Sequence, residues 1–125
     1  MLRIAAVAVG AALGANLRYG LALWAAKRWG SGFPWGTMII NVSGSLLIGL
    51  AIGLAASRLA LTPTWRLLVV TGFCGGYTTF STFAYETYEL LNAGSILRAV
   101  FNATGSMLLG LLAVMAGILA ARLVP

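Results

Sequence analysis

Four long apolar segments constrain this chain more than any other feature of its sequence. They cover about residues 4–26, 37–56, 67–91 and 96–121, and none of them alternates polar and apolar residues as a barrel strand does. Each has roughly 20 to 25 residues, which is enough for a helix to cross a hydrocarbon core of about 30 Å. The segments therefore predict an all-α membrane protein, with four transmembrane helices in a single domain over residues 1–125.

The composition favours a membrane protein and leaves little for enzyme chemistry. Hydrophobic residues make up 61% of the chain and charged residues 8%, whereas soluble domains carry about 25% charged residues. There is no histidine, and Cys74 is the single cysteine, so a structural zinc cluster, an intramolecular disulfide and a histidine-based triad are excluded. We expect no enzyme. The net charge is +6, and the basic residues lie mostly at the ends of the apolar segments, which indicates headgroup anchoring rather than nucleic-acid binding.

Lysines and arginines flank the predicted helices almost evenly on the two sides of the membrane. With four spans both termini share one side, and the count is four against three if Arg18, inside the first segment, is left out. The two groups are Arg3, Arg58, Arg66 and Arg122 against Lys27, Arg28 and Arg98. Because Lys/Arg asymmetry sets orientation, this balance favours dual topology, in which copies insert both ways and pair antiparallel. The alternative is one orientation fixed by some other feature.

Two rows of small residues predict close packing of helices. Gly10 and Gly14 form a GxxxG pair in the first segment, and Ser45, Gly49 and Gly53 form a row in the second. Such rows serve either a partner subunit or packing within one chain, and the sequence leaves both open.

The start of the chain also has a second interpretation. Arg3 followed by "IAAVAVGAALGA" resembles a secretory signal peptide with a small-residue cleavage site. Cleavage would remove Gly10 and leave Arg18 near a new terminus. We expect instead that the first segment is retained as a helix.

Polar side chains within the apolar segments are candidate sites, because they are costly in hydrocarbon unless they are paired. Arg18 either extends to the headgroups or presents a positive charge to a wet vestibule that attracts anions. Asn41 shares a helix face with Thr37 and Ser45. This column is typical of a hydrated ion path, although Asn41 alone is also compatible with a hydrogen bond to a neighbouring helix.

The third segment contains the run "TGFCGGYTTFSTF", residues 71–83. Gly75 and Gly76 predict a break in the helix, which would free backbone carbonyls at membrane depth for Thr78 and Thr79 hydroxyls or for an ion. Unwound carbonyls of broken membrane helices commonly hold Na⁺. The alternative is that the two glycines only permit close packing.

Two phenylalanines follow the predicted break on one helix face. Phe80 and Phe83 are three residues apart, with Ser81 and Thr82 between them. The edge of an aromatic ring carries partial positive charge, and hydroxyls donate hydrogen bonds. Together they predict an uncharged anion site, weak enough to let an ion both enter and leave.

These features together resemble the Fluc (CrcB) fluoride channel family. The runs "GFCGGYTTFSTF", "GANLRY" and "NVSGS" carry the resemblance, which covers essentially the whole chain. It implies an antiparallel homodimer in the bacterial inner membrane, with two fluoride pores at the dimer interface. Fluoride would leave the cytoplasm passively through these pores.

The resemblance also implies roles for individual residues. The pore would be lined by the phenylalanines Phe80 and Phe83, the asparagine Asn41, and the hydroxyls of Ser81, Thr82 and Ser106, with Arg18 near the vestibule. A structural Na⁺ on the two-fold axis would be held by the backbone carbonyls of Gly75 and Thr78 from both subunits. The sequence departs from the family at Tyr77, at Ala84 and in the fourth helix, where only Ser106 is assigned to the pore.

Two other functions fit a small chain of four spans. A dual-topology multidrug exporter would need a carboxylate in the first helix, and "IAAVAVGAALGANLRYGLALWAA" has none; Glu86 and Glu89 lie late in the third segment. A non-transporting membrane subunit would not need a polar, glycine-rich third segment with paired phenylalanines. We therefore expect a passive fluoride channel.

Overall fold

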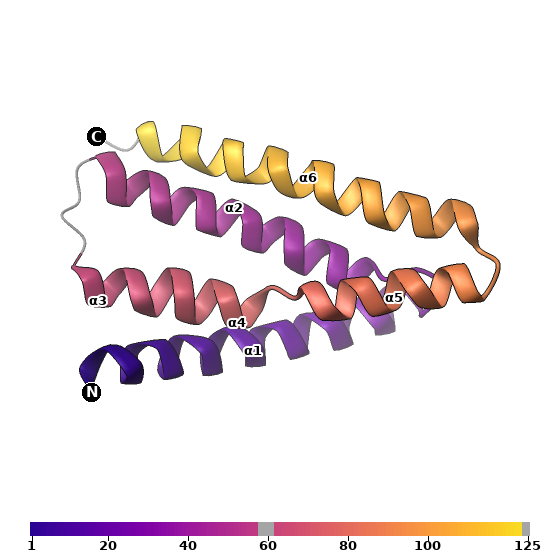
Figure 1. Ribbon diagram of the computed structural model, residues 1–125, viewed down its shortest axis with the longest axis horizontal. Coiled ribbons are helices and arrows are strands. Elements are labelled where there is room, and N and C mark those ends of the chain that lie inside the picture. Colours follow the sequence, from indigo (N-terminus) through magenta and orange to yellow (C-terminus); the bar gives the residue numbers. More distant parts are fainter. Residues whose placement is uncertain (58–61, 124–125) are drawn as a thin grey trace.

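The structure, a computed structural model that describes residues 1–57 and 62–123, is an up-and-down bundle of helices (Figure 1). Helices α1 (Leu2–Trp29), α2 (Trp35–Ser57) and α6 (Ile96–Arg122) are continuous. The third span is assembled from α3 (Pro63–Arg66), the wider π-helix η1 (Leu67–Cys74), α4 (Gly75–Tyr77) and α5 (Phe80–Asn92). Within the described residues, four stretches are long and apolar enough to cross a membrane, so the chain is a multi-pass membrane protein.

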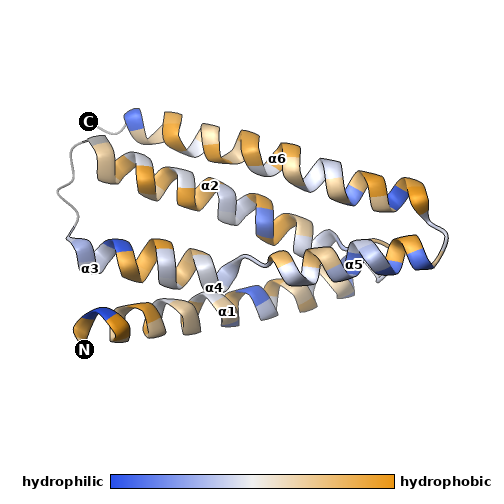
Figure 2. Ribbon diagram, in the orientation of Figure 1, coloured by the Kyte–Doolittle hydropathy of each residue, from blue (hydrophilic) through white to orange (hydrophobic). Residues whose placement is uncertain are grey.

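The start of α1 and the end of α6 lie at the same end of the bundle (Figure 1). Arg3, Arg66 and Arg122 consequently belong to that end. Lys27, Arg28 and Arg98 belong to the other end. Lys27 and Arg28 lie in the last turn of α1, where a cation complements the helix dipole. The predicted position of Arg58 lies outside the described residues. The helices are predominantly apolar, with more polar segments in the middle of α1 and α2 and along α5 (Figure 2).

The bundle is built from two closely packed pairs. Helix α1 lies along η1 and α4, and α2 lies along α6 (Figure 1). The predicted small-residue rows lie at these contacts within one chain: a Cβ added to Gly10 would come within 2.8 Å of the Phe73 amide nitrogen, and one added to Gly53 within 2.6 Å of the Ala121 Cβ. Of the two alternatives left open by the sequence, the glycines of both rows serve packing within the subunit.

The helical backbone of the third span is interrupted at two threonines. Thr78 (φ −79°, ψ 161°) and Thr79 (φ −149°, ψ 122°) are extended, between the end of α4 and the start of α5. Gly75 and Gly76, where the sequence suggested the break, are themselves helical. A Cβ on Gly76 would lie 2.6 Å from the Ala11 carbonyl oxygen, so this glycine permits close approach of α1, and the interruption lies just beyond it.

Candidate functional site

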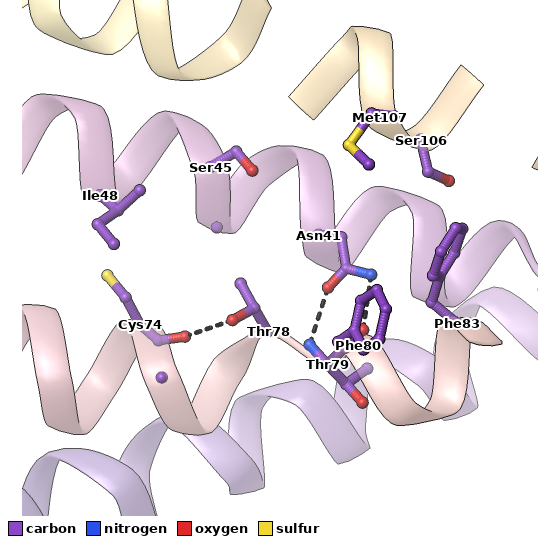
Figure 3. Close-up of a pocket in the computed structure, with 12 residues that line it drawn as sticks. Asn41, Ser45, Ile48, Cys74, Thr78, Thr79, Phe80, Phe83, Ser106 and Met107 are labelled. Carbon is purple, nitrogen blue, oxygen red and sulfur yellow. Dashed lines mark hydrogen bonds between the residues drawn. The ribbon is translucent and has the colours of Figure 1, made fainter. Parts of the chain in front are cut away.

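A cavity of about 340 Å³ lies beside the interruption, between α2, the third span and α6 (Figure 3). It brings together six residues that the sequence assigned to a site: Asn41, Gly75, Thr78, Phe80, Phe83 and Ser106. They come from three different spans, so the cavity exists only in the folded bundle. Arg18, Ser81 and Thr82 do not line it.

The side-chain amide of Asn41 pairs with the extended backbone of Thr79. Its Nδ2 donates to the Thr79 carbonyl oxygen at 2.9 Å, and its Oδ1 accepts from the Thr79 amide at 2.8 Å (Figure 3). Asn41 thus replaces the backbone partners that Thr79 loses by leaving the helix. An asparagine Nδ2 carries two hydrogens, so one N–H remains after the bond to Thr79.

This pairing also alters the end of α4. In a continuous helix the Thr79 amide would donate to the carbonyl of Gly75, four residues earlier. Here the Thr79 amide donates to Asn41 instead, at 2.8 Å. Gly75 is exposed, and a Cβ added to it would meet only the Val70 carbonyl oxygen, at 4.0 Å. Gly75 is therefore an open part of the backbone, and its carbonyl has lost its usual helical donor.

Thr79 begins α5 as its N-cap. Its Oγ1 accepts from the Thr82 amide at 3.3 Å and donates to the Thr82 hydroxyl oxygen at 2.9 Å. The hydroxyl hydrogen of Thr82 is left to donate elsewhere. The N-terminus of a helix also carries partial positive charge, so the first turn of α5 offers an environment that favours an anion without a cationic side chain.

The two phenylalanines lie together on α5. Their ring centroids are 6.0 Å apart and the ring planes are inclined by 44°. Both rings line the cavity, with Phe83 half-buried and Phe80 77% exposed (Figure 3). The edge is the positive part of an aromatic quadrupole, so a ring edge turned into the cavity would favour an anion.

Arg18 reaches the interruption from α1. Its half-buried guanidinium donates through Nη1 to the Thr78 carbonyl oxygen at 3.2 Å. Thr78 follows the last residue of α4, where the negative end of a helix dipole favours a cation. Neither role predicted for Arg18, extension to headgroups or exposure to a vestibule, anticipated this contact.

The carbonyls predicted to hold Na⁺ differ in their surroundings. Gly75 has the open backbone described above, whereas the Thr78 carbonyl already accepts from Arg18. A carbonyl oxygen has two lone pairs, so Thr78 retains one for a cation. The donor set, neutral backbone oxygens at a helix interruption, is of the kind that holds Na⁺ in membrane proteins.

Sequence reasoning missed three hydrogen bonds between spans. Buried Thr37 donates to Glu86 Oε1 at 2.9 Å, and fully buried Asn102 donates to Thr87 Oγ1 at 2.8 Å. The hydroxyls of Ser43 and Tyr77 lie 2.8 Å apart. The sequence does show polar residues within two apolar helices, Thr37 and Ser43 in α2 and Asn102 in α6. It could not show their hydrogen-bond partners, because these lie on a segment distant in the sequence. Thr37, Asn41 and Ser45 do face the third span or its cavity, as their shared helix face predicts.

Comparison with known proteins places the chain in a family. Residues 5–118 match the family described as "CrcB-like protein, Camphor Resistance (CrcB)". A protein of Roseiflexus sp. (strain RS-1), named fluoride-specific ion channel FluC, is 52% identical over 99% of this chain and 100% of its own length. A protein of the same name from Chloroflexus aurantiacus is 52% identical over 94% of this chain and 94% of its own length. One from Thermus thermophilus is 48% identical over 85% of this chain and 83% of its own length. The resemblance seen in the sequence is confirmed, and the chain belongs to the CrcB family.

Proposed function

We propose that this protein is a fluoride-selective channel through which the ion crosses the membrane passively. The similar proteins named fluoride-specific ion channel FluC support this function. In this structure, the observation that carries it is the cavity at the helix interruption, whose lining offers hydrogen-bond donors and ring edges but contains no carboxylate in the described part of the chain.

The chemistry of the cavity suits a small anion. The remaining N–H of Asn41 and the edges of Phe80 and Phe83 present partial positive charge to it. Thr82 and Ser81 do not line this cavity, and in this proposal they would supply hydroxyls beside it, at the start of α5. Because none of these groups carries a full charge, an ion is attracted without being trapped, as conduction requires. Arg18 on the Thr78 carbonyl adds a nearby positive charge.

The working unit in this proposal is an antiparallel homodimer with two pores. The cavity is open on the side where Phe80 is 77% exposed and Met107 is 69% exposed. Lipid tails cannot satisfy the polar groups in the lining of this cavity, so we expect a second subunit to cover it. The nearly balanced basic residues at the two ends of the bundle favour insertion in both orientations, which an antiparallel pair requires.

A sodium ion on the two-fold axis of this dimer is the proposed cofactor. The Gly75 and Thr78 carbonyls of both copies would hold it, and its role would be to fix the interruptions of the two third spans against each other. The proposed location is the bacterial inner membrane, since the relatives compared above are bacterial proteins and this chain has four spans. There, a passive pore releases fluoride that has entered as HF and dissociated inside.

The test is release of anions from liposomes that contain the purified protein, recorded with fluoride and chloride electrodes in parallel. The expected result is rapid fluoride release with negligible chloride release, unchanged by an imposed pH gradient. Release that depends on a proton gradient would favour a coupled exporter, and folded protein that releases no fluoride would favour a non-transporting subunit. Tagging both termini and probing their accessibility on each side tests dual topology, because a single orientation would exclude the antiparallel dimer.

A further inference from the structure

Helix α5, which carries the two phenylalanines, is held to the bundle in an unusual way. None of its residues is buried, so apolar packing within the subunit does little to fix its position. Side-chain hydrogen bonds join the region instead to α2 and α6. These are Asn41 with Thr79 just before α5, Thr37 with Glu86, and Asn102 with Thr87.

The bond from α6 leads directly to the backbone of Phe83. Asn102, 0% exposed, donates from Nδ2 to Thr87 Oγ1 at 2.8 Å, and the Thr87 hydroxyl donates in turn to the Phe83 carbonyl oxygen at 2.8 Å. A hydroxyl has one hydrogen and can accept at the same time, so the two bonds are compatible and fix the Thr87 rotamer. We call this arrangement the Asn102–Thr87 bridge.

Each end of the bridge is hydrogen-bonded to a residue that lines the cavity. Ser106, one turn after Asn102 on α6, donates to Asn102 Oδ1 at 3.5 Å and lines the same cavity as Phe83. The buried amide therefore lies between a lining hydroxyl on α6 and the backbone of a lining residue on α5. A buried amide is costly to leave unpaired, so the bridge opposes any displacement of the Phe83 turn away from α6.

We propose that Asn102 and Thr87 are positioning residues for Phe83, holding its ring at the distance from α6 that fast and selective passage of fluoride requires. The proposal rests on the proposed channel function. The fourth span then contributes to the pore through Asn102 as well as through Ser106. Asn102 acts by positioning Phe83 and does not touch the ion.

The test compares isosteric variants by rate of fluoride release, ratio of fluoride to chloride release, and yield of folded protein in size-exclusion chromatography. Thr87→Val and Asn102→Leu each break the bridge. We expect each to slow fluoride release about tenfold, the effect of losing roughly one hydrogen bond in the conducting state, and to lower the fluoride-to-chloride ratio. The double variant should be no slower than the slower single variant, because both changes break one linkage.

Two controls separate positioning from general stability. Thr87→Ser retains the hydroxyl and should restore the parent rate and ratio. Thr104→Val removes a hydroxyl that donates to the Val100 carbonyl oxygen on α6, at 2.7 Å and on the exposed surface, and it should leave both unchanged.

Several results would contradict the positioning role proposed for Asn102 and Thr87. They are parent-like rates in both single variants, additive losses in the double variant, or a Thr87→Ser variant as slow as Thr87→Val. Loss of folded protein in both single variants would make the pair a determinant of folding rather than of position. A parent protein that releases no fluoride would refute the channel function itself, a result distinct from a conducting parent with unaffected variants.

Discussion

The two halves of the third span are held in the bundle by different forces. Before the interruption, η1 and α4 pack against α1 through glycines, so that backbone lies against backbone. After it, α5 contains no buried residue and is joined to its neighbours by side-chain hydrogen bonds. The first half resembles an ordinary packed membrane helix, and the second half carries Phe80 and Phe83.

This difference explains how a polar site can be built in a small apolar bundle. Close glycine packing fixes the backbone up to Tyr77, and Asn41 then fixes the extended Thr79 with two hydrogen bonds. Hydrogen bonds are directional and strong where water is scarce, so they set the orientation of α5 more narrowly than apolar contact would. The packed half therefore serves as a scaffold, and the hydrogen-bonded half presents the aromatic pair.

The largest expected effect is loss of the scaffold. A Cβ added to Gly14 would lie within 2.8 Å of the Tyr77 amide nitrogen, in contact with backbone that cannot yield. We expect Gly14→Ala to destabilise the protein by about 1–3 kcal/mol or more, the range for overpacking, with a lower midpoint of thermal unfolding in detergent. Gly20→Ala is the matched control on the same helix, because nothing lies within 4 Å of its added Cβ. Equal stability of the two variants would contradict the packing described for α1.

Next in size is loss of the amide that holds the interruption. Asn41→Leu leaves both the amide and the carbonyl of Thr79 without their partner. These two hydrogen bonds are part-buried, so we expect a loss of about 0.5–1.5 kcal/mol for each. We expect fluoride release to be abolished and folded protein to decrease. The matched control is Asn16→Leu, since Asn16 is exposed and bonds only the Ala12 carbonyl oxygen of its own helix. An active Asn41→Leu variant would show that the two hydrogen bonds between Asn41 and Thr79 are dispensable for transport.

Replacing a cavity aromatic should act on transport rather than on folding. Phe83→Ile removes the ring edge while keeping an apolar side chain on a half-buried position. We expect fluoride release from liposomes to fall at least about tenfold, the loss expected for one favourable electrostatic contact, with an unchanged size-exclusion profile. Phe101 lies outside the cavity, with its ring tilted against that of Phe33, and Phe101→Ile should retain the parent rate. If Phe83→Ile conducts as well as the parent, the ring-edge argument fails for this residue.

The smallest effect is expected at Tyr77, on the scaffold side. Tyr77→Phe removes one hydrogen bond, to Ser43, but keeps the ring stacked on Phe73 at 5.9 Å. Ser43 still donates to the Ile39 carbonyl oxygen. We expect a loss of about 0.5–1.5 kcal/mol in the free energy of unfolding and no change in fluoride release, with exposed Tyr19→Phe as the control. A large drop in transport would mean that the scaffold half also tunes the site.

The sequence predicted the spans well, because apolar length is a local property. Four of the residues that it assigned to a pore, Asn41, Phe80, Phe83 and Ser106, meet in one cavity, and their role in a pore stays a prediction. It misplaced the interruption at Gly75 and Gly76, because a glycine in a membrane helix serves close packing as readily as a break. Two sets of hydrogen bonds, from Asn41 to Thr79 and from Asn102 to Thr87, depend on which helices become neighbours. Residue spacing within one helix carries no information about such neighbours.

The central claim, passive conduction of fluoride through an uncharged site, is tested most directly by the reversal potential of currents in a planar bilayer. The two chambers should hold different fluoride concentrations, equal chloride and equal pH. We predict reversal at the equilibrium potential of fluoride, and no shift when a pH gradient is then imposed. Reversal at the chloride potential, or a shift that follows the pH gradient, would contradict the account.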